Sequence, residues 1–419
     1  MRQPRLLAAT LFAVNISIMP AGAAEPPTLL IPDTKAVAER LQSGGTLAPR
    51  RPEPRGDLAQ RLRRWQTGGP VYLWNQEAVA ALLNRQQGNL PASRVLALLH
   101  ATLYDVALVA ETARTPDSSF PGTATAMNTA ALAVLSALLP AETERFRALA
   151  DEGQMLHRQA GLETETDTAA GKLIGEEVAR AALARSRDDG SQAKWAGTVP
   201  VGPGKWLATS PPAGPGTPQW RTWVLASADA IRPAPPPEFG SPQFTAALSE
   251  VKNYARNPQA IENAIFWHAY GGGRNYQMWH RELSSRALEH GYAQEPLRMA
   301  AAFAALSLAY ADAHIACWEA KYQHWYIRPS QADPSITTLV PLPSHPSYPS
   351  AHSCLSSAGA SVLAALFPTE ARQFNELTKQ SGESRIAAGL HYRFDCDAGD
   401  EIGRRAAALA LAKLASALR

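Results

Sequence analysis

Two basic residues near position 320 are spaced to bind a common anion. Lys321 and Arg328 are seven residues apart, which is about two turns of an α-helix, so both would project from one helix face. Pro329 disfavours helical geometry at Arg328 and would leave its guanidinium near a helix end. Two cations on one face without an intrahelical acidic partner indicate an anion site; a solvated charged face is the alternative for this segment taken alone.

The segment Pro349-Ser350-Ala351-His352 has the composition of a helix start. Proline beside serine is typical of a first helical turn, and a run rich in alanine, serine and leucine follows as far as Leu366. The free N–H groups of a first turn and the positive end of the helix dipole together favour an anion. His352 would lie in this turn, where a histidine beside serine is a candidate for acid/base catalysis.

A second histidine, His391, follows an arginine and precedes an aspartate. Arg385 and His391 are six residues apart, roughly 240° around a helix, so they converge only if the chain bends between them. Gly389 permits such a bend. Asp395 lies four residues after His391, close enough to hold one ring nitrogen and leave the other as a nucleophile or metal ligand.

The three segments form one ordered pattern: K-x6-RP, then PSAH, then SR-x5-H-x3-D. This pattern resembles the signature shared by type 2 phosphatidic acid phosphatases and vanadium-dependent haloperoxidases. The wider chain is similar to exported bacterial haloperoxidases in the helical stretch 90–105, the Pro/Trp-rich middle, the pair Phe266–Trp267 and the sequence HYRFD at the third motif. The resemblance covers most of the chain and is densest after residue 246.

The resemblance implies an all-α fold, a large helical bundle with one pocket for a tetrahedral oxyanion. The residues that bind vanadate or phosphate would be Lys321, Arg328, Ser350, Ala351, Arg385 and His391. His391 would bond to the central atom, as a metal ligand to vanadium or as a transient phosphohistidine. His352 would act as the acid/base, and Asp395 would orient His391. Trp318 and His345 would lie on the halide or substrate side.

The sequence departs from the family pattern at two places. Ala351 replaces the usual glycine of PSGH; its backbone N–H still serves if the local φ is negative. The family also carries an acid shortly after the Phe-Trp pair, oriented toward the acid/base histidine. Here Phe266–Trp267 is followed by His268 and a glycine-rich stretch, with no acid.

These features predict a vanadium-dependent haloperoxidase that uses vanadate bound at His391 to oxidise halide with hydrogen peroxide. An acid phosphatase or phosphoesterase is the alternative; it would need no cofactor and would cleave a phosphate ester through a phosphohistidine. The chain length and Trp318, three residues before Lys321, favour the haloperoxidase. A non-catalytic oxyanion-binding protein is a third possibility, against which His352 and Asp395 argue, because binding alone requires neither.

The remaining histidines divide into two groups. His345 lies seven residues before His352, where the resemblance to bromoperoxidases implies bromide and iodide oxidation with little chloride oxidation. A brace for the following proline turn is the alternative role of His345. We expect His100, His157 and His314 to be structural.

The elements that must position these residues are helical along most of the chain. Residues 24–195 are rich in alanine and leucine with helical periodicity. Residues 196–245 are rich in proline and tryptophan and predict a strap over the helices, with a free spacer as the alternative. Helical patterns return in 246–419, the half that carries all three motifs. Because alternating strand patterns are scarce, the periodicity also predicts an all-α protein.

Residues 1–23 have the three parts of a secretory signal peptide. A charged start is followed by an apolar core and by the small residues Ala21-Gly22-Ala23. Cleavage would leave a periplasmic or secreted protein without a membrane span; an N-terminal membrane anchor is the alternative. The uncharged stretch 122–141 carries several polar residues and predicts a buried helix in preference to a membrane span.

The composition excludes several classes of protein. The 419 residues include 40 Lys plus Arg and 37 Asp plus Glu, giving a formal charge of +3. This near-neutral balance, without a basic run, argues against a nucleic-acid partner, so the expected partners are small molecules. Cys317, Cys354 and Cys396 are too few for a disulfide framework and lack metal-ligand spacing. Whether any two of them pair, and the oligomeric state, are left open.

Overall fold

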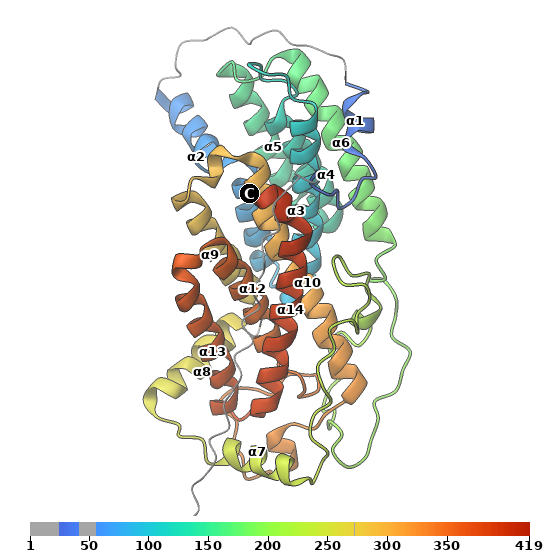
Figure 1. The fold of residues 1–419 in the computed structure, drawn as a ribbon, viewed down its shortest axis with the longest axis vertical. Helices are drawn as coiled ribbons and strands as arrows, with labels where there is room; N and C mark the ends of the chain where they lie inside the picture. The colour runs from blue at the N-terminus through green and yellow to red at the C-terminus, as the bar shows by residue number, and fades with distance from the viewer. Residues whose placement is uncertain (1–24, 42–55, 272) are drawn as a thin grey trace, which may run out of the picture.

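Fourteen α-helices make up most of the described chain, and the longer ones run along the long axis of the molecule (Figure 1). The computed structural model describes residues 25–41, 56–271 and 273–419. In these ranges there is no β-strand, and one isolated bridge joins Lys205 to Tyr326. The predicted all-α fold class is confirmed. The predicted signal peptide, residues 1–23, lies outside the described residues.

The helices have the following bounds: α1 Thr34–Ala38, α2 Gly56–Asn84, α3 Asn89–Thr112, α4 Thr123–Leu138, α5 Thr143–Gln159, α6 Glu165–Arg187, α7 Pro242–Lys252, α8 Pro258–Gly271, α9 Asn275–Glu289, α10 Pro296–His324, α11 Pro329–Ala332, α12 Ala351–Leu366, α13 Ala371–Ala387 and α14 Arg393–Leu418.

Two long helices, α3 and α10, lie against each other at the centre. By length and composition alone, both could cross a membrane. Their apolar windows are 89% and 100% buried inside the protein, which identifies them as core helices. The uncharged stretch 122–141 contains α4, whose residues are largely buried and which packs against α3 and α6.

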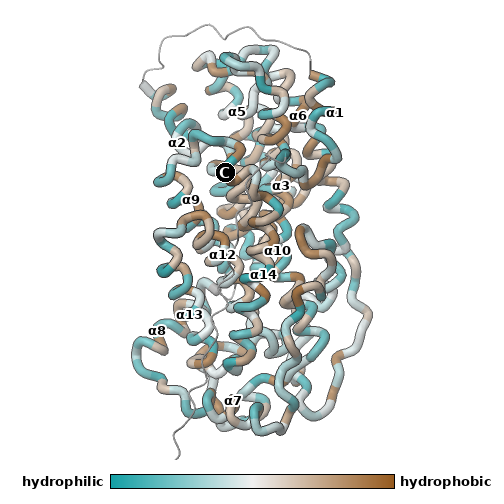
Figure 2. The backbone as a smooth tube through the Cα atoms, in the orientation of Figure 1, coloured by the Kyte–Doolittle hydropathy of each residue, from teal (hydrophilic) through white to brown (hydrophobic). Residues whose placement is uncertain are grey.

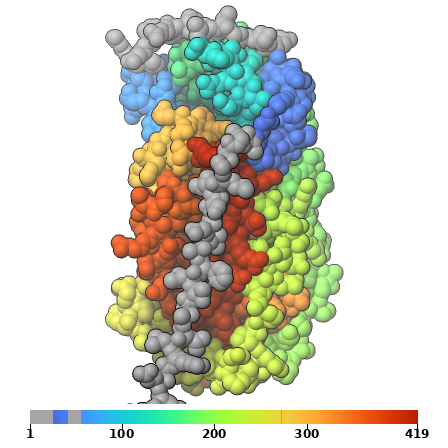
Figure 3. Space-filling view, viewed as in Figure 1, coloured from blue at the N-terminus to red at the C-terminus, as the bar shows by residue number. Residues whose placement is uncertain are grey.

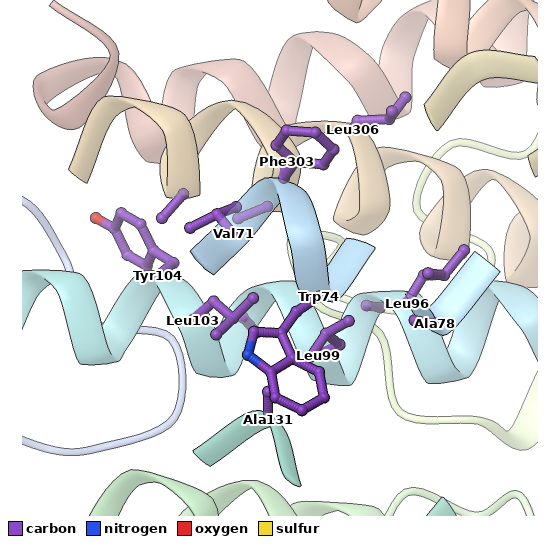
Figure 4. Packing of buried hydrophobic residues seen from close by; sticks show 14 of the residues in the cluster. Val71, Trp74, Ala78, Leu96, Leu99, Leu103, Tyr104, Ala131, Phe303 and Leu306 are labelled. Carbon is purple, nitrogen blue, oxygen red and sulfur yellow. The ribbon is translucent and has the colours of Figure 1, made fainter. Parts of the chain in front are cut away.

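Large side chains from three helices fill the space around this centre (Figure 4). Trp74 of α2, Leu99 of α3 and Phe303 of α10 are fully buried in one core cluster. Trp74 also donates from Nε1 to Asn128 Oδ1 at 2.8 Å, so the polar atom of the ring is satisfied. Figure 2 shows hydrophilic residues interspersed along the outer helices.

Two non-helical segments are each fastened to a central helix by one buried carboxylate. Asp105 of α3 accepts the backbone N–H groups of residues 29–31 at 2.7 to 3.0 Å. Asp312 of α10 accepts those of residues 223–225 at 2.7 to 2.9 Å. Each carboxylate is fully buried and satisfies three backbone donors at once.

The second of these segments belongs to the Pro/Trp-rich residues 196–245, which we call the strap. Leu225 and Ile231 of the strap pack with Ile402 and Ala406 of α14. Figure 3 shows the yellow-green strap beside the red C-terminal helix on one face of the molecule. The strap is therefore held to the helices, while the exact domain boundaries stay predictions.

All three cysteines are buried and free. Cys317 of α10 and Cys354 of α12 belong to one apolar cluster, and Cys396 of α14 donates to the Gly382 carbonyl at 3.5 Å. In this structure no disulfide joins any of the three.

Candidate active site

Lys321 lies in the last turn of α10 and is fully buried. The helix ends at His324, and Trp325 follows with a left-handed φ of 52°. Arg328 therefore lies beyond the helix, and the expectation that the two cations share one helix face was wrong. The turn at Trp325 brings them together instead, because both donate to the Pro346 carbonyl. Lys321 completes its hydrogen bonds with the carbonyls of Ser347 and Pro349.

Arg328 has extended backbone geometry directly before Pro329, as predicted. Its guanidinium is fully buried. Nη1 donates to the Leu390 carbonyl at 2.9 Å and to Nε2 of His391 at 3.1 Å. Nη2 and Nε donate to the His345 carbonyl at 2.9 and 3.3 Å. Each nitrogen of Arg328 thus has a partner within the protein.

The PSAH segment starts α12, as predicted. Ser350 is the N-cap, and its Oγ accepts the Ser353 N–H at 3.4 Å. Ala351 is the first helical residue and has no positive φ, so its Cβ fits without strain. The alanine that replaces the family's glycine therefore leaves the backbone N–H of the first turn in place.

Gly389 turns the chain between Arg385 and His391. α13 ends at Ala387, and Gly389 then adopts a φ of +74°, which is the bend that the sequence predicts. A Cβ on Gly389 would lie 2.9 Å from the Thr337 carbonyl oxygen, so both conformation and space require glycine. After the bend, Arg385 and His391 line the same cavity.

Asp395 orients His391 inside the protein. Nδ1 of His391 donates to Asp395 Oδ2 at 2.9 Å, and the same oxygen accepts from Ser347 Oγ at 2.5 Å. Burial raises the pKa of Asp395 to about 7, although the Ser347 hydrogen bond and the nearby cations oppose this shift. Burial and then the charge of Arg328 hold the pKa of His391 well below its usual range. His391 is therefore neutral, with its proton on Nδ1 and a lone pair on Nε2.

Arg385 is the cation that keeps a spare donor. Its Nε donates to Ser384 Oγ at 3.0 Å and its Nη2 to the Ala264 carbonyl at 2.7 Å, but Nη1 is buried without a partner. Among the described residues, neither Arg385 nor Lys321 nor Arg328 forms an ion pair. Burial lowers the pKa of Lys321 to about 8 and those of both arginines to about 10. These shifts reflect the cost of burying the cations, which the charge of Asp395 offsets only in part for Lys321 and Arg328.

His352 lies in the first turn of α12, and its Nε2 is 3.0 Å from the Trp267 carbonyl oxygen. Because a carbonyl only accepts, Nε2 carries the proton and Nδ1 has the free lone pair. The Trp267 carbonyl thus orients His352, for which the sequence offers no acid after Phe266–Trp267. Burial and then Arg385 keep the pKa of His352 well below its usual range.

His345 and Trp318 are neighbours on the same wall. The centroids of their two rings are 5.3 Å apart. Arg328 Nη2 lies 3.2 Å from Nδ1 of His345. Trp318 Nε1 donates to the Ala213 carbonyl of the strap at 2.9 Å. The strap therefore closes the site on the side of Trp318.

These side chains meet at a cavity of about 380 Å³. Residues 88–91 and 341–343 line part of this cavity. The site residues that line it are His268, His314, Trp318, His345, Ala351, His352, Arg385 and His391. Lys321, Arg328 and Ser350 are not among the lining residues and lie in the layer behind them. The sequence analysis missed His268 and His314, although His314 precedes Trp318 by one helical turn, a spacing that places both on one face.

A second cavity, of about 490 Å³, lies between α12, α13 and α14. It is lined by no histidine, and its arginines are paired: Arg393 with Glu250 and Glu383, and Arg404 with Asp400. It therefore lacks the histidines and the buried, unpaired arginine of the first cavity; its remaining cation, Lys379, is exposed.

The fold is that of known vanadium enzymes. A bacterial vanadium-dependent iodoperoxidase superposes with a TM-score of 0.68 over 82% of this chain and 96% of its own, at 22% sequence identity. The apo form of a bacterial vanadium-dependent chloroperoxidase superposes with a TM-score of 0.61 over 78% of this chain and 93% of its own, at 15% identity. No protein-family model and no curated protein matches the chain. The chain therefore has the all-α fold of the vanadium-dependent haloperoxidases.

Proposed function

We propose that this protein is a vanadium-dependent haloperoxidase that oxidises halide, with bromide and iodide favoured, using hydrogen peroxide at a vanadate held by His391. The observation that carries the proposal is that three buried cations, Lys321, Arg328 and Arg385, form no ion pair in the described chain. Arg328 contacts His391, and Arg385 lines the same cavity as His391. Buried positive charge without a counter-charge is costly. A tetrahedral oxyanion would remove that cost.

The residues present fit vanadate. His391 is neutral and offers the lone pair of Nε2 as a ligand, and Nη1 of Arg385 has no other partner. The first-turn N–H of Ala351 and the positive end of α12 would add hydrogen bonding and favourable charge, and Lys321 and Arg328 would act through their charge from the layer behind. When bound, vanadate supplies the electrophilic centre at which hydrogen peroxide becomes an oxygen donor to halide.

His352 is placed to move a proton within the cavity. Its Nε2–H is committed to the Trp267 carbonyl, so Nδ1 is the atom that can accept a proton from hydrogen peroxide. A bound oxyanion would raise the pKa of His352 by adding negative charge nearby, which makes the imidazole a better base when the site is loaded. His352 would then return this proton to the oxygen atom of hydrogen peroxide that is not transferred to halide.

The halide preference is proposed from His345. Its ring lines the cavity beside Trp318 and is held by Arg328. A polar ring at this position admits water and weakens the field of the cations behind it, which suits the more easily oxidised halides.

A phosphatase acting through a phosphohistidine at His391 could use the same residues, because an oriented neutral imidazole is also a nucleophile. Two assays separate the functions: bromide-dependent oxidation by hydrogen peroxide with added vanadate, and hydrolysis of a phosphate ester without vanadate. Vanadate-dependent bromide oxidation would support the haloperoxidase. Ester hydrolysis that vanadate inhibits, without bromide oxidation, would overturn it in favour of the phosphatase.

We also propose that the enzyme acts outside the cytoplasm, in the periplasm or as a secreted protein. The support is the signal-peptide pattern of residues 1–23. N-terminal sequencing of the exported protein tests this, and a retained leader would contradict it.

A further inference from the structure

Two of the three cysteines lie together in the core. Cys317 of α10 and Cys354 of α12 are fully buried in one apolar cluster, and the two helices pack against each other (Figure 1). The thiols of the two residues are hydrogen-bonded to each other. Cys396 belongs to a different cluster, where its thiol donates to the Gly382 carbonyl. The fold thus brings one pair of free thiols together and keeps the third apart.

The thiol pair lies about one helical turn from the residues of the anion site. Cys317 precedes Lys321 by four residues, and Cys354 follows Ser350 by four. Lys321 already joins α10 to the segment before α12, because its ammonium donates to three carbonyls of residues 346–349. A bond between the two sulfur atoms would therefore tie the same two elements together a second time, one turn further into the core.

The central cavity lies in front of the thiol pair. Neither cysteine lines the cavity, but each has lining residues three positions before it and one position after it. These neighbours are His314 and Trp318 in α10, and Ala351 and Leu355 in α12. Residues four apart share a helix face, so each cysteine lies just behind the wall that its neighbours form. A small oxidant formed in the cavity has one layer of side chains to cross.

The pair is poorly suited to react with hydrogen peroxide itself. Burial, and then the hydrogen bond with Cys317, raise the pKa of the Cys354 thiol well above its usual range. Peroxide reacts with the thiolate, of which a thiol with a raised pKa provides very little. Hypohalous acid is a stronger electrophile and attacks a neutral thiol. The product of the proposed reaction is therefore the oxidant that suits this pair.

We infer that Cys317 and Cys354 form a disulfide when hypohalous acid is made in the cavity, and that this bond fixes α10 against α12. The inference rests on the proposed function. One sulfur takes the halogen of hypohalous acid, and its proton leaves with the hydroxide as water. The second sulfur then displaces halide and releases its own proton. The balance is 2 RSH + HOX → RSSR + H₂O + H⁺ + X⁻, so the two thiols lose two electrons to the halogen and the halide is regenerated.

The disulfide would protect the site from its own product. A single buried thiol would be oxidised further to a sulfinic or sulfonic acid, which would place a charge in an apolar cluster. A second thiol in contact ends the oxidation at the disulfide instead. The new bond also restricts the unfolded chain and so stabilises the folded one. The helix that carries Lys321 and the helix that begins after Ser350 would then stay in register while oxidant is present.

Peptide mapping of the full chain tests the inference. Reduced wild type, without vanadate, is treated with a small excess of preformed hypobromous acid, then unfolded, alkylated and digested without reduction for mass spectrometry. We expect a peptide that links Cys317 to Cys354 and an alkylated Cys396. Hydrogen peroxide alone should form the link at least about tenfold more slowly, because so little thiolate is present. The linked protein should unfold at a temperature about 4 °C higher than the reduced protein.

Two variants are matched to this measurement. Cys396→Ser removes the thiol that lies apart and should form the same link as wild type. Cys354→Ser removes one partner and should show neither the link nor the rise in unfolding temperature. The peptide map of wild type decides the matter even if a variant does not fold.

Three alkylated cysteines in treated wild type would overturn the inference, as would a link that includes Cys396. Equal rates with the two oxidants would contradict the role of hypohalous acid, and an unchanged unfolding temperature would contradict the stabilising role. Because reagent hypobromous acid replaces the enzyme's own product, the mapping is independent of the proposed function. A protein that forms the link with the reagent but oxidises no bromide with vanadate and hydrogen peroxide would contradict the proposed function and leave the disulfide standing.

Discussion

Nη1 of Arg328 donates to Nε2 of His391 at 3.1 Å, while Asp395 accepts from Nδ1 of the same ring at 2.9 Å. A guanidinium only donates and a carboxylate only accepts, so the two contacts select one neutral tautomer of His391. The lone pair that could bind a central atom is the one that Arg328 occupies in this structure. A ligand at Nε2 must therefore displace this hydrogen bond, and Arg328 would then act on the ligand through its charge.

The first prediction follows from the charge of Arg328, which helps to hold the pKa of His391 down. In Arg328→Gln the positive charge is gone, so protonation of His391 becomes easier and its pKa should rise toward the ordinary value. A pH titration of the histidine ring ¹⁵N shifts measures this. Arg180→Gln, at an exposed arginine that pairs with Glu177, is the control and should leave the titration unchanged. An unaltered His391 titration in Arg328→Gln would contradict the assignment.

The second prediction separates the two histidines by role. His391→Ala should abolish vanadate binding and any phosphatase activity, because it removes the atom that bonds to vanadium or phosphorus. His352→Ala should still bind vanadate but lose turnover by roughly 10²–10⁴-fold, as for a general acid/base. Vanadium retained after dialysis, measured by mass spectrometry, reports binding, and bromide oxidation reports turnover. Equal loss of vanadium from both variants would show that the roles are exchanged.

The third prediction concerns the spare donor of Arg385. Nη1 of Arg385 has no protein partner, whereas the donors of Lys321 are all taken by carbonyls. Arg385→Gln should therefore weaken vanadate binding by about 10–100-fold, the worth of a charged hydrogen bond. Competition between vanadate and phosphate, followed by ⁵¹V NMR, measures the affinity. Unchanged affinity in Arg385→Gln, with Arg180→Gln again as the control, would remove Arg385 from the anion site.

Much of this arrangement follows from local sequence. The six-residue spacing of Arg385 and His391 demands a bend, and Gly389 supplies it with a φ of +74°. The proline and serine before Ala351 predict the start of α12, because they are first-turn residues. The apolar periodicity likewise predicts the helical fold, since packing a continuous apolar face is what stabilises a long helix.

Other features of the candidate site cannot be predicted from the local sequence. α10 stops at His324 because Trp325 adopts a left-handed conformation, which a bulky residue rarely does and which no local pattern announces. The partner of His352 is the backbone carbonyl of Trp267. Every residue has a carbonyl, so a search for an acidic side chain could not find it. The place of His314 in the cavity depends on long-range packing of the strap and α3 around α10.

The fourth prediction concerns Asp312, whose pKa burial raises to about 6, although three backbone N–H groups oppose the shift. The folded state holds this proton more tightly than the unfolded chain, in which aspartate titrates near 4. Its contribution to stability is therefore full below about pH 4 and is lost as the pH rises through 6, by on the order of 3 kcal/mol. Urea unfolding at pH 4 and pH 7 should show a smaller pH dependence for Asp312→Asn than for wild type.

The asparagine variant keeps one carbonyl oxygen for the strap but places an NH₂ group among the backbone donors. At pH 4, however, Asp312 of wild type is itself protonated and also presents a donor to these N–H groups, so the two proteins should differ little in stability at that pH. Asp188→Asn, at an exposed aspartate, should behave like wild type at both pH values. An undiminished pH dependence in Asp312→Asn would show that other buried acids carry it.

The last prediction concerns the halide. The ring of His345 lines the cavity 5.3 Å from Trp318, with Arg328 Nη2 at 3.2 Å from its Nδ1. A polar ring here keeps water near the cations and screens the field that would activate peroxide, so wild type should oxidise bromide and iodide but little chloride. His345→Phe should exclude water and raise the chloride rate relative to bromide. The measurement is a halide series at mildly acidic pH in both proteins. Chloride oxidation by wild type at a rate comparable to bromide would refute the role of His345, whatever the variant does, because the polar ring would then not limit the oxidant.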